Sequence, residues 1–449
     1  MKEIISIQLG SAGNAIGESY WKLVRNEHDL SSCSGSVSMG DISVLFREEK
    51  SGNHFRRAIK CDLSSSDYSK SATIQPDLDP SNILISDSGS DNCYAKAFHT
   101  TGPPIAQSVV ERVRRELERC DCIHAVQFLH SSIGGTGSGL GGLLMKSLRD
   151  YINGGSKCMF VSGCLVPAPS STDSLLSVFN TVLCLHDLSE YCHLAIPFDV
   201  EALVSKPLRP FDTISRCISG LTSSMRFPGV LNTDLRKIHS LLIPFKNANF
   251  LIPSYASSRE HSFIDLTHDA LDRHAPCISI DPQLDQSRNL ASLLSFRGHD
   301  IQPSQVDAMS RSIQEKGSRY DKFFPDWIPN SISASLASSD ASLQKAISLT
   351  TFSNNTGIHQ FHDTILSAWD KQFKARSHVY VYEENGIHPD EMIEARNLVQ
   401  YVSDQYKEYS KWEDKILVKP GNSGWTVNET SLISADQRNI ANELLRISM

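Results

Sequence analysis

A glycine-rich segment between two apolar runs carries the clearest chemistry in this sequence. Residues 130–142 read HSSIGGTGSGLGG, with Ala125–Leu129 before them and Leu143–Met145 after them. Glycines let the backbone approach a ligand closely, and the first amide groups of a helix attract an anion. The pattern therefore predicts a strand, a phosphate-binding loop and a helix. It has neither the lysine of a Walker loop nor the GxGxxG order of a dinucleotide fingerprint. A flexible linker would use similar residues, but it would not be held between two apolar segments.

A second glycine-rich turn lies close to the N-terminus. Glu3–Leu9 has the alternation of a strand, GSAGNAIG follows at residues 10–17, and a helix is expected to about His28. In a parallel α/β sheet, nucleotides bind at the carboxyl ends of the strands, where such turns lie. A purely structural turn uses the same residues, so this turn alone leaves both interpretations open. Two turns of one kind favour a nucleotide site.

Composition limits the function classes. The chain has 449 residues, 40% hydrophobic and 21% charged, which is enough for two or three soluble domains. A formal net charge of -8 argues against a sequence-independent nucleic-acid binder, which would carry a basic surface. We find no signal peptide and no apolar run of membrane-spanning length, so we expect a cytosolic or nuclear protein with neither nucleic acid nor membrane as partner. The eleven cysteines contain no CxxC pair and no His spacing for a zinc site, so we expect buried thiols.

The elements that must position these loops alternate between strand and helix. Further strands are expected at Ile42–Phe46, Ala58–Leu63, Met159–Val166 and Leu194–Ile196. Helices are expected from Gly102, where prolines open an amphipathic stretch, and over residues 173–188. This alternation is typical of a doubly wound α/β domain.

Beyond Arg226–Gly229 the pattern changes to that of a second, α+β domain. Asn232 or Asp234 is expected to cap a helix that ends near Leu242. Strands are expected at Phe250–Ile252, Cys277–Ile280, Leu290–Phe296, Ile332–Leu336 and Ala346–Phe352, with helices near 303–316 and 357–374. A last helix over Asp390–Asp414 carries an apolar stripe on one side and charged residues on the other.

Several motifs, in this order, resemble those of the tubulin family, and of β-tubulin more than the α type. They are the opening MKEI followed by GNAIG, the GGTGSG loop, MRFPG at 225–229, LNTDLRK at 231–237, FRG at 296–298 and DWIPN at 326–330. The resemblance covers residues 1 to about 412. It implies a doubly wound GTP-binding domain at 1–200, connecting helices and a partner-facing loop at 201–248, an intermediate α+β domain at 249–365, a C-terminal helical hairpin at 366–415 and a non-acidic tail at 416–449.

The resemblance also implies a nucleotide site for GTP or GDP with Mg²⁺. Its nucleotide-binding positions are Gly10, Ser11, Ala12, Asn92, Ser131, Gly134, Gly135, Thr136, Gly137, Ser138, Asp173 and Val200. No catalytic residue is carried over. In the family, a Glu of the α-type partner completes hydrolysis in the adjoining site, and Lys237 fills that position here, as in β subunits. A cation cannot accept the proton of the attacking water.

Several positions depart from the family pattern. Ser11 stands where the family has a Gln that contacts phosphate, and Ser64 replaces a carboxylate that helps to hold Mg²⁺, so the metal position is degenerate. Ile133 replaces the first glycine of the loop and restricts its φ. Val200 replaces an Asn that reads the guanine edge, and the aromatic residue and Asn of the family's YGDLN motif have no firm counterpart within 207–211.

Two functions follow from the resemblance. The first is a β-tubulin-like GTP-binding subunit of cytoplasmic microtubules, joined head-to-tail to an α-tubulin-like partner through its nucleotide face and through Asn232, Asp234 and Lys237. Protofilament neighbours, and motor or associated proteins on the C-terminal helices, would be further partners. The alternative is a pseudo-GTPase of the same fold that acts as a non-hydrolysing interaction or capping module. The retained phosphate loop favours the first function, whereas the lost Gln, carboxylate and Asn favour the second. A metabolic Rossmann enzyme is disfavoured because no acid–base pair or nucleophile accompanies the loops.

Two surface segments also differ from the family. The loop at 257–262 resembles the family's lateral-contact loop but is shorter and lacks its glycine, which predicts weaker lateral association. In the tail at 416–449 the basic and acidic residues cancel, so it is not expected to attract basic proteins electrostatically. Its end predicts either a short docking helix or disorder.

Overall fold

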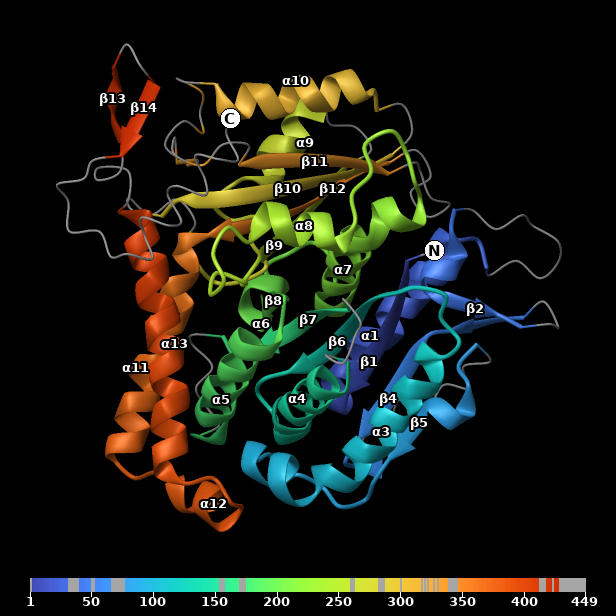
Figure 1. Ribbon diagram of the computed structural model, residues 1–449, viewed down its shortest axis with the longest axis vertical. Helices are drawn as coiled ribbons and strands as arrows, with labels where there is room; N and C mark the ends of the chain where they lie inside the picture. The colour runs from blue at the N-terminus through green and yellow to red at the C-terminus, as the bar shows by residue number, and fades with distance from the viewer. Residues whose placement is uncertain are drawn as a thin grey trace.

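The computed structural model describes residues 2–30, 40–49, 53–65, 77–152, 158–168, 175–258, 263–281, 287–298, 301–315, 318, 320, 323–325, 328, 331–337, 346–411, 417–421 and 424–427. Two sheets lie one above the other, and a pair of long helices runs along one side of both (Figure 1). Five predicted features fall wholly or partly outside the described residues: Asp173, the loop after Ser258, the DWIPN motif except Ile328, the end of the last helix at Asp414, and most of the tail.

The first domain is built on a six-stranded sheet in the order β5-β4-β1-β6-β7-β8, in which every neighbouring pair is parallel. Its strands are β1 (Glu3–Leu9), β4 (Ala58–Asp62), β5 (Ile83–Ile85), β6 (Ile123–Ser131), β7 (Met159–Val166) and β8 (Leu194–Asp199). The predicted strands β1, β4, β7 and β8 are confirmed. Every residue of β1 and β7 is buried, as expected of a parallel sheet with helices on both faces.

Helices cover this sheet on both sides. On one face lie α3 (Gly102–Leu117), α4 (Gly141–Ile152) and α5 (Leu175–Tyr191), and on the other lie α1 (Gly10–Glu27) and α7 (Pro210–Arg226). Alternate residues of β1 show the division: Ile5 and Ile7 pack under the first group, whereas Ile4 packs under the second. The predicted helices α1, α3 and α5 are confirmed with small shifts of their ends.

The sequence analysis gave α7 no bounds of its own and expected only connecting helices within 201–248. Its buried face carries an apolar stripe of Ile214, Cys217, Ile218 and Leu221, flanked by small and hydroxyl-bearing residues, namely Thr213, Ser215, Ser219, Gly220, Thr222, Ser223 and Ser224. Ser219 Oγ donates to Glu27 Oε1 of α1 at 2.7 Å, and the hydroxyl oxygens of Ser223 and Ser295 lie 3.1 Å apart. The spacing of the four apolar residues is that of an amphipathic helix, so it was a signal that could have found α7, and hydrogen bonds add to its packing.

The second domain contains a four-stranded sheet in the order β11-β10-β12-β9, with only the β10–β11 pair parallel. Its elements are α8 (Leu235–Leu242), β9 (Ile252–Ser258), α9 (Phe263–Ala270), β10 (Asn289–Arg297), α10 (Pro303–Gln314), β11 (Ile332–Ala337) and β12 (Ile347–Asn355). The predicted strands β10, β11 and β12 and the helices α8 and α10 are confirmed. Asp234 is the cap of α8, since its Oδ1 accepts from Lys237 N at 2.8 Å.

Two predicted strands are wrong, and a third lies later than expected. In place of a strand at Ile42–Phe46, Asp41 Oδ1 accepts from Ser43 N at 3.1 Å and caps a 3₁₀ turn; β2 (Phe46–Glu48) follows and pairs with β3 (His54–Arg56). The segment Cys277–Ile280 is not a strand, because Ile280 N donates back to Ile278 O at 2.9 Å and the chain curls. The strand expected at Phe250–Ile252 begins only at Ile252.

The C-terminal helices form the expected hairpin. It consists of α11 (His359–Lys374), α12 (Val379–Glu384) and α13 (Pro389–Ser410), and it packs on α5, where the rings of Phe179 and Trp369 lie 6.1 Å apart (Figure 1). The predicted stripe of α13 is buried at Met392, Ala395, Val399, Val402, Tyr406 and Tyr409. This helix ends at Ser410 instead of Asp414, and β13 (Leu417–Gly421) and β14 (Gly424–Val427) form a small hairpin beyond it. None of the described helices is both long and apolar enough to cross a membrane.

A buried ionic cluster joins the two domains. Arg226 Nη1 of α7 donates to Glu27 Oε2 at 2.6 Å, and Arg297 Nη1 of β10 donates to Glu27 Oε1 at 2.9 Å. Both guanidinium groups also lie over the ring of Phe227. Burial raises the pKa of Glu27, but Arg297 and Arg226 outweigh burial and lower it to about 2. The carboxylate therefore stays ionised and ties α1, α7 and β10 together.

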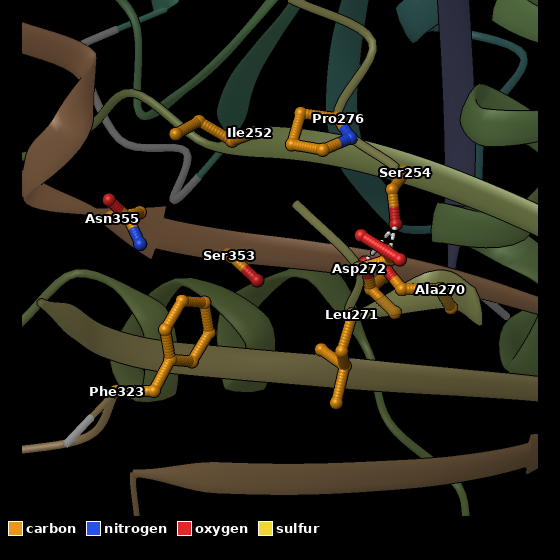
Figure 2. A pocket seen from close by; sticks show the side chains of 10 residues that line it. Ile252, Ser254, Ala270, Leu271, Asp272, Pro276, Phe323, Ser353 and Asn355 are labelled. Carbon is orange, nitrogen blue, oxygen red and sulfur yellow. Dashed lines mark hydrogen bonds between the residues drawn. The ribbon is translucent and has the colours of Figure 1, made fainter. Parts of the chain in front are cut away.

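The second domain holds a small cavity of about 20 Å³ between β9, α9 and β12 (Figure 2). On its wall, Ser254 Oγ donates to Ala270 O at 2.6 Å and lies 2.6 Å from Thr351 Oγ1. This volume suits a single water molecule. The cavity is far too small for a nucleotide, so the search for a ligand site returns to the first domain.

Candidate nucleotide-binding site

A cavity of about 530 Å³ lies at the carboxyl ends of β1, β4 and β6. Four loops contribute its wall, with Leu165 of β7: Gly10, Ser11 and Ala12; Asp62 and Ser64; Gly89, Ser90, Asp91 and Asn92; and Ser131, Ile133, Gly134, Gly135, Thr136 and Gly137. The two glycine-rich turns that the sequence singled out thus meet at one place. This is the edge at which a parallel α/β sheet binds ligands.

The positions of the main loop differ in how much room they leave for a side chain. A Cβ on Gly135 would lie 2.6 Å from Cys93 N and O, and one on Gly137 would lie 2.4 Å from Ser131 O. At Gly134 a Cβ would meet only Asn92 Oδ1, at 3.3 Å. Gly135 and Gly137 are therefore required because the loop presses against neighbouring backbone, whereas Gly134 faces side chains that can move.

Two buried side chains fix the loop from behind. His130 Nδ1 donates to Gly137 O at 2.9 Å, and His130 Nε2 accepts from Ser162 Oγ at 2.8 Å. Asn180 Nδ2 of α5 donates to Asn92 O at 2.8 Å and to Ile133 O at 3.0 Å. Asn180 escaped the sequence analysis, although an amide within an apolar helix was a signal that could have found it.

The predicted nucleotide-binding residues mostly come together. Nine of the twelve line the cavity, and so does the metal position Ser64: Gly10, Ser11, Ala12, Asn92, Ser131, Gly134, Gly135, Thr136 and Gly137. Ser138 does not line it; its Oγ donates back to Gly134 O at 2.6 Å and so holds the loop in shape. Asp173 lies outside the described residues. Val200 lies in a second cavity.

Two carboxylates that the sequence analysis missed line the cavity. Asp62 ends β4, and its Oδ1 accepts from Ser64 N at 3.3 Å. Asp91 has a positive φ of 47° and pairs with Lys96. Carboxylate oxygens are the ligands that Mg²⁺ prefers. The donor set therefore fits a magnesium ion even though position 64 is a serine.

The second cavity, of about 630 Å³, adjoins the first, because Leu165 lines both. Its wall consists of Ala15, Glu18, Ser19, Lys22, Leu165, Val200, Arg209, Pro210, Phe211 and Asp212. Val200 and Phe211 are each 39% exposed, so their apolar surface is open to a ligand. No side-chain amide is among these lining residues.

The predicted partner-facing residues lie at the opposite edge of the sheet. Lys2, just before β1, pairs with Asp234. Gly10, just after β1, lines the cavity of about 530 Å³, which we call the cradle. Burial raises the pKa of Asp234, but the hydrogen bond from Lys2 lowers it below its usual value. Asn232 Oδ1 accepts from Gly229 N at 2.7 Å, and Lys237 is exposed. Asn232 and Asp234 thus shape this surface, and Lys237 projects from it.

Comparison with known proteins agrees with this architecture. Residues 3–206 match the Tubulin/FtsZ family, GTPase domain, and residues 238–367 match the Tubulin C-terminal domain. The tubulin beta chain of Porphyra purpurea is 31% identical over 435 residues, which cover 91% of this chain and 93% of that protein. The chain belongs to the tubulin family. The tubulin beta chain of Pneumocystis carinii and the tubulin beta-6 chain of Gallus gallus are each 30% identical, over 91% of this chain and 96% and 95% of theirs.

Membership in the tubulin family gives the cradle a ligand class. The matched GTPase domain contains both glycine-rich turns and the whole wall of the first cavity. It also contains the wall of the second cavity except for residues 209–212. This tubulin is therefore a guanine-nucleotide-binding cytoskeletal subunit, and the cavity at the sheet edge lies within its GTPase domain.

Proposed function

We propose that this tubulin is a β-tubulin-like GTP-binding subunit that assembles head-to-tail with an α-tubulin-like partner into cytoplasmic microtubules. The cradle supports this most strongly, because its loop backbone is held in place by His130 and Asn180 without depending on the side chains that have changed. Similarity to β chains over 91% of the sequence supports the β-like assignment.

In this proposal the phosphates lie against the main loop. Backbone amides near Gly134 to Ser138 and the hydroxyls of Thr136 and Ser131 donate to them, and the start of α4 adds its dipole. Asp62 and Asp91 would hold Mg²⁺, in place of the degenerate position Ser64. Bound there, the ion would neutralise part of the phosphate charge.

The base would lie in the adjoining cavity, beside Val200 and Phe211. The ring of Phe211 offers a surface for stacking, but Val200 offers no hydrogen bond to the guanine edge. A base-edge group left unpaired costs about 1–3 kcal/mol. We therefore expect weaker discrimination between GTP and ATP than an amide at this position would provide.

Assembly follows from the two opposite edges. The cradle of one subunit would face the Asp234 and Lys237 surface of the next. Lys237 cannot accept the proton of an attacking water, so hydrolysis in this chain's own site would need a carboxylate from an α-like partner. Motor and associated proteins would bind the outer helices α11 and α13.

The alternative proposal is a pseudo-GTPase that caps or joins filaments without hydrolysis. It is favoured by three replacements in the two cavities, at Ser11, Ser64 and Val200, which weaken contacts to the phosphate, the metal and the base. Both proposals share the nucleotide site and differ in turnover.

One experiment tests the proposals together. The full-length protein is purified natively, its bound nucleotide is extracted and identified, and GTP turnover is then measured with and without α-tubulin. The main proposal expects GTP or GDP to be retained and turnover to require the partner. Retained nucleotide without turnover in co-assembled filaments would favour the alternative. A folded protein that retains no nucleotide and binds none would overturn both.

A further inference from the structure

Three buried side chains converge directly behind the phosphate loop. His130 comes from the end of β6, Cys164 from β7 and Cys184 from α5, and each is at most 2% exposed. Their ligand atoms all lie within 4.8 Å of one another, and Cys164 Sγ is 3.9 Å from His130 Nδ1. No spacing in the sequence reveals this group, because its members come from three separate elements.

The residue types and separations suit a tetrahedral metal ion. In a zinc site, bonds of about 2.3 Å to sulfur and about 2.0 Å to nitrogen place neighbouring ligand atoms about 3.5–3.8 Å apart. The observed separations, at most 4.8 Å, exceed these values by no more than about 1.3 Å, which a small rotation of side chains would remove. We propose that His130, Cys164 and Cys184 bind one Zn²⁺ ion beneath the nucleotide cradle.

Charge selects the divalent ion. Two thiolates and a neutral imidazole carry two negative charges, which Zn²⁺ cancels. A monovalent ion such as Cu⁺ would leave one uncompensated negative charge in a site that is closed to water. Thiolate and imidazole are also ligands that suit zinc.

The surroundings complete the site. His130 Nε2 lies 2.8 Å from Ser162 Oγ; with the metal on Nδ1, the ring proton moves to Nε2, which then donates to this oxygen, as metal-binding imidazoles usually do. The other nitrogen, Nδ1, faces Cys164 and lies 2.9 Å from Gly137 O, which offers an oxygen for the fourth position. Metal binding would then replace the hydrogen bond to Gly137 and tie the loop to β7 and α5.

Metal analysis of the full-length protein tests the proposal. Protein produced in zinc-supplemented medium and desalted without chelator should contain about one zinc per chain by mass spectrometry. Cys164→Ser and Cys184→Ser should each lower this content at least fivefold. Cys158→Ser is the matched control, since Cys158 is also buried next to β7 but lies outside the group, and it should retain the metal.

Cobalt gives a second readout that does not depend on a variant folding. Wild-type protein produced with Co²⁺ should show the near-ultraviolet charge-transfer band of cobalt–thiolate bonds, and Cys164→Ser should lack it. Folded wild-type protein with neither zinc nor the cobalt band would overturn the proposal, and the group would then be two thiols and an imidazole without a metal. Zinc content that is unchanged in both cysteine variants would overturn it as well. None of these measurements involves nucleotide.

Discussion

Gly137→Ala should disable the phosphate cradle, whereas Gly134→Ala should not. The Cβ that the first substitution adds would lie 2.4 Å from Ser131 O and 2.8 Å from Ser131 N, where ordinary contacts begin at 3.4 Å. The backbone of Ser131 resists movement, because this last residue of β6 is paired with Leu165 of β7 and β6 lies between β1 and β7 in the sheet. The loop would therefore move outward by about 1 Å, which stretches an ordinary hydrogen bond of about 2.9 Å beyond its useful range.

The loss can be estimated from that displacement. A hydrogen bond to a charged group contributes about 1.5–3 kcal/mol, so losing one lowers the affinity for GTP roughly 10- to 150-fold. Calorimetry with GTP on each variant gives the affinity, and circular dichroism checks that the fold is intact. Gly134→Ala should stay within about threefold of wild type, since its Cβ meets only the movable Asn92 side chain at 3.3 Å. Equal affinities for folded Gly137→Ala and wild type would refute the reasoning.

Other predictions concern stability and assembly. Burial lowers the pKa of His362 from 6.5 to about 3. Below pH 6.5 this histidine is protonated in the unfolded chain but not in the folded chain, so the free energy of unfolding falls as the pH drops. Urea unfolding at pH 7 and pH 5 should show a loss of about 2 kcal/mol from this group, which His362→Phe abolishes; an unchanged pH dependence would contradict this. Glu27→Gln should destabilise the protein by about 3 kcal/mol, because it leaves Arg226 and Arg297 without their counter-charge, and a change in the free energy of unfolding of less than about 0.5 kcal/mol would speak against it. Lys237→Ala should leave the rate of GTP hydrolysis in mixed filaments unchanged. If filaments of this chain alone hydrolysed GTP and Lys237→Ala abolished that activity, the view that Lys237 takes no part in hydrolysis would be wrong. Deletion of 416–449 should leave motor affinity nearly unchanged in a pelleting assay, and a large loss would count against the view of the tail as electrostatically neutral.

Sequence patterns predicted the parts of the fold that a short-range signal controls. Glycines before a helix marked both loops of the cradle, and the family motifs confirmed their order. The buried strand β1 was found from the alternation over Glu3–Leu9, and β7 from its largely apolar run at Met159–Val166. By contrast, α7 was given no bounds, although Ile214, Cys217, Ile218 and Leu221 have the spacing of an amphipathic helix and residues 201–248 were expected to hold connecting helices.

The site was predicted less completely, for a different reason. Comparison with the family motifs shows only which motif positions keep or lose the family's residue, and so it revealed that Ser64 replaces a carboxylate. It does not show that Asp62 and Asp91 bring carboxylates to the same cavity from other loops. Likewise the family pattern does not single out Asn180, whose side chain reaches two loops; only its place as an amide within an apolar helix could have marked it.

The position of Lys2 and Gly10 at opposite ends of one buried strand also determines the symmetry of any polymer. A contact between the cradle edge and the Asp234 edge joins two different surfaces, so the resulting interface is heterologous. Such an interface does not close on itself after two copies; unless its rotation forms a ring, it leaves one free surface of each kind at the ends. In the head-to-tail assembly proposed above, a filament built from this chain would consequently be directional, with a nucleotide pocket open at one tip and covered everywhere else.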